Sequence, residues 1–192
     1  MMRGITSGIA ASAIVALLTA VDALAAERPV LPKLLKALNL SGYSSVMQPP
    51  EFSGVTADGE RVALEGLSGR VVLLNFWAAW CLECRPEMTA FERLHREFSV
   101  QGLAVVGINA REGTSTIREY AKELGLTFPL LPDPAGKINS AYGVIGLPTT
   151  FLVGRNGRAV ALAVGSREWS GKPARALIQA LLAEPATPQG SR

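Results

Sequence analysis

Residues 71–88 read VVLLNFWAAWCLECRPEM, and this stretch decides the fold. Its first seven residues are apolar apart from Asn75, which is typical of a strand buried on both faces of a sheet. The chain is then expected to turn over residues 78–81 and to enter a long helix. Two cysteines, Cys81 and Cys84, therefore lie where a buried strand passes into a helix.

These two cysteines are the only ones in the chain and stand three positions apart. A disulfide across so short a loop removes little chain entropy, so the pair is a poor structural staple. Free backbone N–H groups at a helix N-terminus stabilise negative charge and lower the pKa of a thiol placed there. We therefore expect Cys81 to attack partner disulfides and the more buried Cys84 to resolve the mixed disulfide. The alternative, half of a zinc site, needs two further soft ligands, and His95 is the only histidine.

The chain has 192 residues, a formal net charge of +3 and charges of both signs mixed along its length. This length suits one domain with a core of its own, and no run of Lys and Arg is dense enough to indicate a nucleic-acid-binding surface. One cation, an apolar run and an A-x-A motif over residues 1–25 indicate a cleaved signal peptide, with an uncleaved membrane anchor as the alternative. The expected parts are a signal peptide over 1–25, an N-terminal extension over 26–50, a domain over 51–184 and a flexible tail over 185–192.

Hydrophobic periodicity and turn residues predict the remaining elements. Helices are expected over 31–40, from the cysteine pair to about residue 98, over 114–124 with Thr114 or Ser115 as the cap, over 137–142 and over 172–182. Strands are expected in a hairpin within 52–64 around Asp58-Gly59, at 103–109 and 128–131, and in a closing hairpin of 149–153 and 159–164. This alternation predicts an α/β fold whose mostly parallel sheet is covered on both faces, with the closing hairpin as an antiparallel edge.

Two motifs, NFWAAWCLECRPEM over residues 75–88 and GVIGLPTTFLV over residues 143–153, are similar to those of a known family. They resemble the thioredoxin-like proteins of the TlpA, ResA and CcmG (DsbE) group, over about residues 52–182. The resemblance implies a thioredoxin-like fold, with a central mixed sheet flanked by helices and an N-terminal β-hairpin. The long separation between Cys84 and Pro148 leaves room for the extra αβ insertion of that group.

The resemblance also implies that the Leu147–Pro148 peptide bond is cis and lies against the cysteine pair. Proline is the residue for which a cis bond is cheap, although the residues alone favour an ordinary trans turn. A substrate peptide is then expected to pair with the backbone at Leu147, with Trp80 and Thr149 as further substrate contacts. Trp80 stands directly before Cys81 and is expected to form an apolar rim.

An acid three residues after the second cysteine is buried in the resembling family and adjusts the cysteine pKa values. Glu87 holds that position here, and the alternative is a solvated helix glutamate. Thioredoxin has a buried aspartate on the preceding strand where this chain has Asn75, so Glu87 is the only acid candidate for proton transfer. Glu83, between the cysteines, opposes thiolate formation and favours a reductant.

The expected function is that of an exported, periplasmic thiol:disulfide oxidoreductase that reduces protein disulfides, for example in cytochrome c maturation or at copper-site cysteines. We expect a monomer with no cofactor and no metal, protein substrates that carry cysteines or disulfides, no nucleic-acid partner, and a membrane thiol donor of the DsbD/CcdA kind implied by the resemblance. A peroxidase is the first alternative, but Ala78 replaces the threonine of the P-x-x-x-T-x-x-C pattern. A copper chaperone is the second, but it needs C-x-x-x-C and a histidine beyond His95. The intact cysteine pair argues against a binding module without enzymatic activity.

Overall fold

A computed structural model describes residues 30–186. The elements in chain order are α2 (Val30–Ala37), β1 (Ser41–Gly42), β2 (Ser53–Val55), β3 (Arg61–Ala63), η1 (Glu65–Leu67), β4 (Val71–Trp77), α3 (Cys84–Phe98), η2 (Ser99–Gln101), β5 (Leu103–Ala110), α4 (Thr114–Leu124), β6 (Leu130–Asp133), α5 (Lys137–Ala141), β7 (Thr149–Val153), β8 (Ala159–Val164) and α6 (Lys172–Leu182). The predicted signal peptide over 1–25 and most of the predicted tail lie outside the described residues. No helix within residues 30–186 is both long and apolar enough to cross a bilayer.

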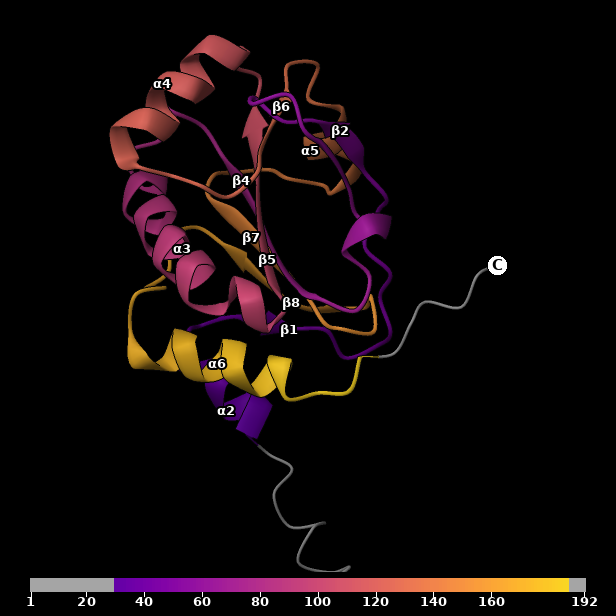
Figure 1. Ribbon diagram of the computed structural model, residues 1–192. Helices are drawn as coiled ribbons and strands as arrows, with labels where there is room; N and C mark the ends of the chain where they lie inside the picture. The colour runs from indigo at the N-terminus through magenta and orange to yellow at the C-terminus, as the bar shows by residue number, and fades with distance from the viewer. Residues whose placement is uncertain (1–29, 187–192) are drawn as a thin grey trace, which may run out of the picture.

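The central sheet has six strands in the order β1-β8-β7-β4-β5-β6 (Figure 1). Strands β4, β5 and β6 run parallel, whereas β7, β8 and β1 join by antiparallel pairing. The mixed sheet is therefore confirmed, but two details of the prediction are wrong. The sheet is not mostly parallel, because three of its five pairings are antiparallel. The closing hairpin is not an edge, because the unpredicted β1 pairs with its outer strand β8.

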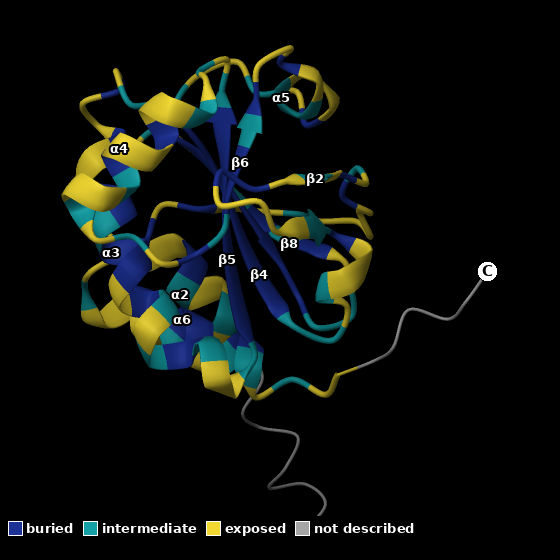
Figure 2. Cartoon of the chain, turned by 45° about the horizontal axis from the view of Figure 1, so that its top comes forward, coloured by how far each residue is buried: buried dark blue, intermediate teal, exposed yellow. Residues whose placement is uncertain are grey.

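Both faces of the sheet are covered, as the continuous apolar run of β4 predicted. Alternate residues of β4 enter two separate hydrophobic clusters, with Leu73 and Trp77 in one and Leu74 and Phe76 in the other. Helices α2, α3, α4 and α6 contribute to the first cluster, and the β2–β3 hairpin region and α5 border the second. The strands run dark blue through the centre between these layers (Figure 2). This burial holds the carboxyl end of β4 rigid at the point where the chain leaves for the cysteines.

Most predicted boundaries agree with the structure to within three residues. Helix α3 begins at Cys84, so Cys81 lies in the preceding turn rather than in the helix. Strand β6 starts at Leu130, two residues later than predicted, and the stretch between β5 and β7 holds α4, β6 and α5, which includes one helix and one strand for the expected αβ insertion. Gly113 occupies the N-cap of α4 and no side-chain cap bond forms, so the predicted cap by Thr114 or Ser115 is wrong.

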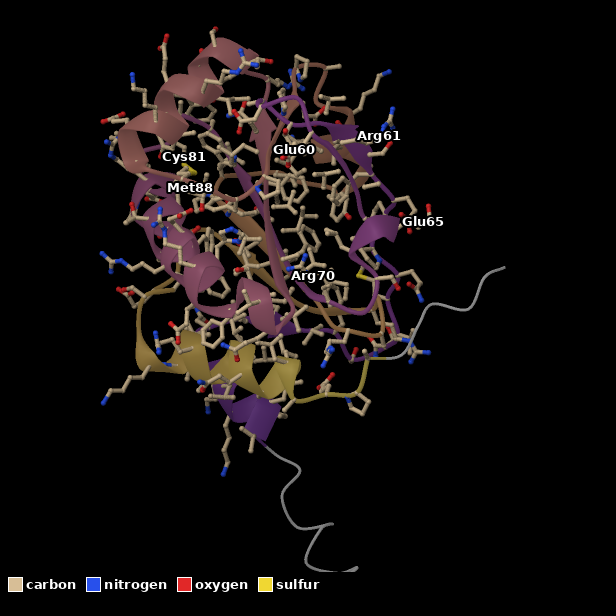
Figure 3. The ribbon with its side chains drawn as sticks, in the orientation of Figure 1. Glu60, Arg61, Glu65, Arg70, Cys81 and Met88 are labelled. Carbon is tan, nitrogen blue, oxygen red and sulfur yellow. A yellow bond between two sulfur atoms is a disulfide. The ribbon has the colours of Figure 1, made fainter. Side chains whose placement is uncertain are left out.

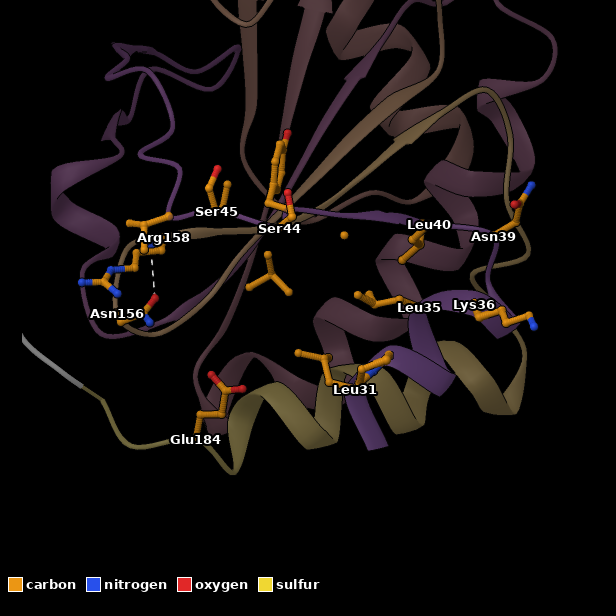
Figure 4. Close-up of a pocket in the computed structure, with 16 residues that line it drawn as sticks. Leu31, Leu35, Lys36, Asn39, Leu40, Ser44, Ser45, Asn156, Arg158 and Glu184 are labelled. Carbon is orange, nitrogen blue, oxygen red and sulfur yellow. Dashed lines mark hydrogen bonds between the residues drawn. The ribbon is translucent and has the colours of Figure 1, made fainter. Parts of the chain in front are cut away.

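The N-terminal segment from Val30 to Gly42 is part of the folded domain. Helix α2 packs against α6, and Leu35, Leu38 and Leu40 are buried in the first cluster. An open cavity of about 770 Å³ lies beside α2, β1 and the β7–β8 turn (Figure 4). None of the predicted site residues lines this cavity.

Candidate active site

Cys81 and Cys84 form a disulfide at the junction of β4 and α3, with their Cα atoms 5.3 Å apart (Figure 3). The rigid strand delivers the chain to this point, and the turn before α3 brings the two side chains together. The surface of Cys81 is 7% exposed to solvent, whereas Cys84 is fully buried. The first cysteine is therefore the one that solvent reaches, in the order that the sequence predicted.

The N-terminus of α3 is directed at the Cys81 sulfur. The backbone N–H of Cys84, the first residue of the helix, donates a hydrogen bond to Cys81 Sγ at 3.2 Å. Glu83 is the N-cap residue and makes no side-chain cap bond. This N–H, which also donates to the Cys81 carbonyl at 3.1 Å, and the helix dipole both favour negative charge on the sulfur once the disulfide is reduced. The Cys84 N–H thus provides the hydrogen bond that the predicted lowering of the Cys81 pKa requires, although Cys81 lies outside the helix.

Glu112 fastens the turn that precedes Cys81. Its Oε2 accepts the backbone N–H of Ala79 at 2.7 Å and the Nδ2 donor of Asn109 at 2.7 Å. Its own N–H donates to Asn109 Oδ1 at 3.1 Å. Since Asn109 lies beside Trp77 in the β4–β5 register, the carboxylate ties the cysteine turn to the neighbouring strand. Glu112 was not expected from the sequence; the available signal was the polar Asn109 near the end of the buried strand β5, with Glu112 three residues later.

Glu87 is buried, with 2% of its surface exposed, and lies one turn beyond Cys84 on α3. Burial raises the pKa of its carboxyl group to about 7, although hydrogen bonds from the Arg167 backbone and the Trp169 indole act in the opposite direction. The alternative of a solvated helix glutamate is therefore excluded. A carboxyl group with a pKa near 7 can exchange a proton at neutral pH.

The Leu147–Pro148 peptide bond is cis, as the resemblance implied. Pro148 and Thr149 are buried and Leu147 is half-buried. Thr149 begins β7 beside Phe76 near the end of β4, and its hydroxyl donates to the Gly146 carbonyl at 2.7 Å. The fold thus brings this segment to the end of the sheet from which the cysteine turn leaves. The substrate contacts expected of Leu147 and Thr149 stay predictions.

Apolar side chains are exposed on the segments that carry the site. Trp80 is 68% exposed, Leu82 is 85% exposed, and Ile145, before the cis proline, is 92% exposed. Only Trp80 was expected from the sequence. Large apolar side chains held in water at a site are typical of a surface that contacts another protein.

Asn75 and His95, the other polar residues singled out in the sequence, are packed against core residues. Asn75 is fully buried, and its Nδ2 donates to Thr150 Oγ1 at 3.0 Å. His95 packs its ring against Phe128 with centroids 6.1 Å apart, and burial lowers the pKa of its imidazole. Within residues 30–186, no group of three or more His, Cys, Asp or Glu side chains is arranged to hold a metal ion.

Comparisons with known proteins agree with this geometry. The model of the AhpC/TSA family matches residues 47–161. The thioredoxin-like protein YneN of Bacillus subtilis is 41% identical over 128 residues, covering 65% of this chain and 74% of YneN. The thiol-disulfide oxidoreductase ResA of the same organism is 33% identical over 147 residues, covering 71% of this chain and 82% of ResA.

A solved structure gives the same result for the fold. The secreted thiol-disulfide isomerase of Corynebacterium glutamicum superposes with a TM-score of 0.66 at 26% identity, covering 76% of this chain and 92% of that protein. The resemblance to the ResA group and the thioredoxin-like fold are therefore confirmed. With its cysteine pair at the β4–α3 junction, the chain belongs to the AhpC/TSA family and, within it, to the thioredoxin-fold thiol:disulfide oxidoreductases.

Proposed function

We propose that this protein is an exported reductase of protein disulfides. The direction of electron transfer is inferred from two acids close to the cysteines in the sequence. Glu83 is the N-cap residue of α3, and the buried Glu87 lies one turn later. Negative charge at both positions opposes a thiolate on the cysteines. A dithiol whose reduced form is not strongly stabilised has a low reduction potential and gives electrons away.

The reaction follows from the geometry of the two sulfurs. In the reduced protein, the Cys81 thiolate attacks one sulfur of a partner disulfide, an S–S bond to the partner forms, and one partner thiolate leaves. Cys84 then loses its proton, which the Glu87 carboxylate accepts, and attacks Cys81 Sγ. The second partner thiolate leaves, two electrons have passed to the partner, and the protein holds the Cys81–Cys84 disulfide. A dithiol donor must return two electrons before the next turnover.

Partner binding is assigned to the exposed apolar side chains and the cis-proline segment. Trp80 supplies apolar contact beside Cys81, and an extended partner peptide pairs with the backbone at Leu147 and Thr149. Proteins with cysteines or disulfides are the substrate class, with cytochrome c maturation and copper-site cysteines as the two roles that the family suggests. A membrane thiol donor of the DsbD/CcdA kind is the proposed source of electrons.

Export is proposed from the pattern of residues 1–25, which suits a signal peptide. The secretion of the related isomerase of Corynebacterium glutamicum supports it. The segment over 26–50, whose helix α2 packs on the domain, and the domain over 51–184 would then lie in the mature chain. N-terminal sequencing of the protein from the producing cell, with a new terminus at residue 26, is the expected result.

Insulin reduction in dithiothreitol tests the activity. The wild-type protein accelerates precipitation of the insulin B chain, and Cys81→Ser abolishes the acceleration, whereas Cys84→Ser accumulates a covalent complex with the partner. Activity in Cys81→Ser equal to that of the wild type would show that Cys81 is not the attacking thiol. The direction is tested by titration against glutathione, which should give a potential of about −180 mV or below, while a value near −120 mV would make the protein an oxidant.

A further inference from the structure

The carboxyl group of Glu87 is held by a loop that is remote in sequence. Its Oε1 accepts the backbone N–H of Arg167 at 2.6 Å and the indole N–H of Trp169 at 2.9 Å. Its Oε2 is buried and has no hydrogen-bond partner. Both donors belong to the segment between β8 and α6, so this loop sets the orientation of the carboxyl group.

Trp169 is built into the core rather than laid over it. Its side chain is 1% exposed, and its ring packs on Phe91 of α3 with centroids 5.4 Å apart. The ring is therefore immobilised on the same helix that carries Glu87, with its one polar atom on the carboxylate. A buried indole N–H that finds a charged acceptor makes one of the stronger hydrogen bonds available to a neutral donor.

The loop is fastened from outside by the side chain of Arg167. Its Nε donates to the Asn39 carbonyl at 3.0 Å, and its Nη1 donates to the carbonyls of Gly165 at 3.2 Å and Ser166 at 2.8 Å. Asn39 follows α2 and adopts a left-handed conformation with φ of 52°. One residue thus links the N-terminal segment, through its side chain, to Glu87, through its backbone.

We propose that Trp169 and Arg167 are positioning residues for Glu87: the Trp169 indole orients the carboxyl group toward its proton-transfer role, and the Arg167 side chain clamps the loop to the N-terminal segment. Neither residue touches the reacting sulfurs. The proposal rests on the proton-transfer role of Glu87 in the proposed function. Its first test measures the titration of the Glu87 carboxyl group. The positioning proposal can therefore fail while the proposed direction of electron transfer stands, and the reverse.

The charges and hydrogen bonds around Glu87 determine in which direction its pKa should change when one hydrogen bond is removed. The Arg167 guanidinium favours the carboxylate, and the Glu83 carboxylate disfavours it. Two hydrogen bonds also favour the charged form, so removing one raises the pKa of Glu87 further above its ordinary value. The loss of a hydrogen bond to a charged acceptor corresponds to a rise of about one to two pKa units.

The decisive variant is Trp169→Phe in the full chain, because phenylalanine keeps a ring against Phe91 and lacks the N–H. We expect the carbon-13 NMR titration of the Glu87 carboxyl, assigned by its loss in Glu87→Gln, to move up by about one to two pH units. Trp77→Phe is the matched control, because Trp77 is equally buried and its Nε1 has no hydrogen-bond partner. A Glu87 midpoint that is the same in folded Trp169→Phe as in the wild type would overturn the proposal.

The wild-type protein provides a second measurement that does not depend on the folding of the variant. The indole N–H resonance of Trp169 should shift with pH at the same midpoint as the Glu87 carboxyl, and those of Trp77 and Trp80 should not follow it. A pH-independent Trp169 resonance would overturn the proposal. In the reductase assay, Trp169→Phe should displace the pH profile, and it should have no such effect in a Glu87→Gln background.

The clamp is tested by Arg167→Ala with amide hydrogen exchange at Arg167 and at the Trp169 indole. Release of the loop should speed both exchanges by at least tenfold, while Lys172→Ala, which removes an exposed cation just beyond the loop, should leave them unchanged. Wild-type exchange rates in Arg167→Ala would show that the side chain does not hold the loop.

Discussion

The backbone N–H of Cys84 points at Cys81 Sγ across 3.2 Å, so one cysteine of the pair is the hydrogen-bond acceptor of the other. Cys81 keeps a small exposed area and Cys84 keeps none. The two sulfurs are therefore unequal in both charge stabilisation and access. This inequality, rather than the spacing alone, assigns the attacking and resolving roles.

Alkylation of the reduced protein should distinguish the two thiols. Cys81 should react with iodoacetamide at neutral pH with a thiolate pKa below the ordinary value of about 8.5, because the Cys84 N–H and the helix dipole stabilise its anion. Cys84 should stay unmodified until the protein is unfolded in urea. Peptide mass spectrometry after timed quenching measures both rates. Preferential labelling of Cys84 in the folded protein would reverse the assigned roles.

Glu112→Ala should weaken the turn that carries Cys81. The variant leaves the Ala79 N–H and the Asn109 amide without their shared acceptor, at a cost of about 1–3 kcal/mol in the free energy of unfolding. Insulin reduction should slow several-fold because the attacking sulfur loses its fixed position. Glu119→Ala, which removes an exposed glutamate of α4, is the control for both measurements. Equal urea midpoints for the two variants would argue that the Glu112 bonds add nothing to stability.

Glu87→Gln should change the pH dependence of stability. Burial raises the pKa of Glu87 from 4.5 to about 7 in the folded protein. Between these values the folded state keeps a proton that the unfolded state releases, so this contribution is complete below about pH 4.5 and is lost as the pH rises through 7. Glutamine can still accept both hydrogen bonds at its oxygen but does not titrate. From pH 5 to pH 8 the variant should therefore gain stability relative to wild type, by up to roughly 3 kcal/mol.

Urea unfolding of the oxidised proteins at pH 5, 6, 7 and 8 measures this difference. Glu119→Gln controls for the loss of one carboxylate from the chain. A stability difference between Glu87→Gln and wild type that stays constant over the four pH values would contradict the raised pKa of the buried group.

Leu35→Ala should show that the N-terminal segment is part of the core. Leu35 lies on α2 and is buried in the larger cluster, so truncation should cost about 2–5 kcal/mol in the free energy of unfolding. Val30→Ala on the same helix removes a side chain that is 52% exposed and should cost under about 0.5 kcal/mol. Equal losses in the two variants, measured by thermal or urea unfolding, would show that α2 does not dock as described.

Local pattern was enough to predict the elements that carry the cysteines. The run from Val71 to Trp77 is apolar on both alternating sides, and its burial follows directly from that pattern. The helix period after Cys84 and the Asn-Gly turn between β7 and β8 are equally local. What the pattern could not supply was the order of strands. The central position of β7 and the cover of β8 by β1 depend on long-range pairing and on where α2 docks.

By itself, therefore, the sequence determined the strand–turn–helix junction, the spacing of Cys81 and Cys84 and the candidate acid Glu87, because these depend on near neighbours in the chain. Only the tertiary structure decided what surrounds them. The Trp169 indole reaches Glu87 across 82 positions of sequence, and Glu112 reaches Ala79 across 33. Such contacts carry no periodic signal, since they form only when separate elements pack into one core. The burial that raises the Glu87 pKa has the same origin, and it makes an ordinary helix glutamate suited to proton exchange at neutral pH.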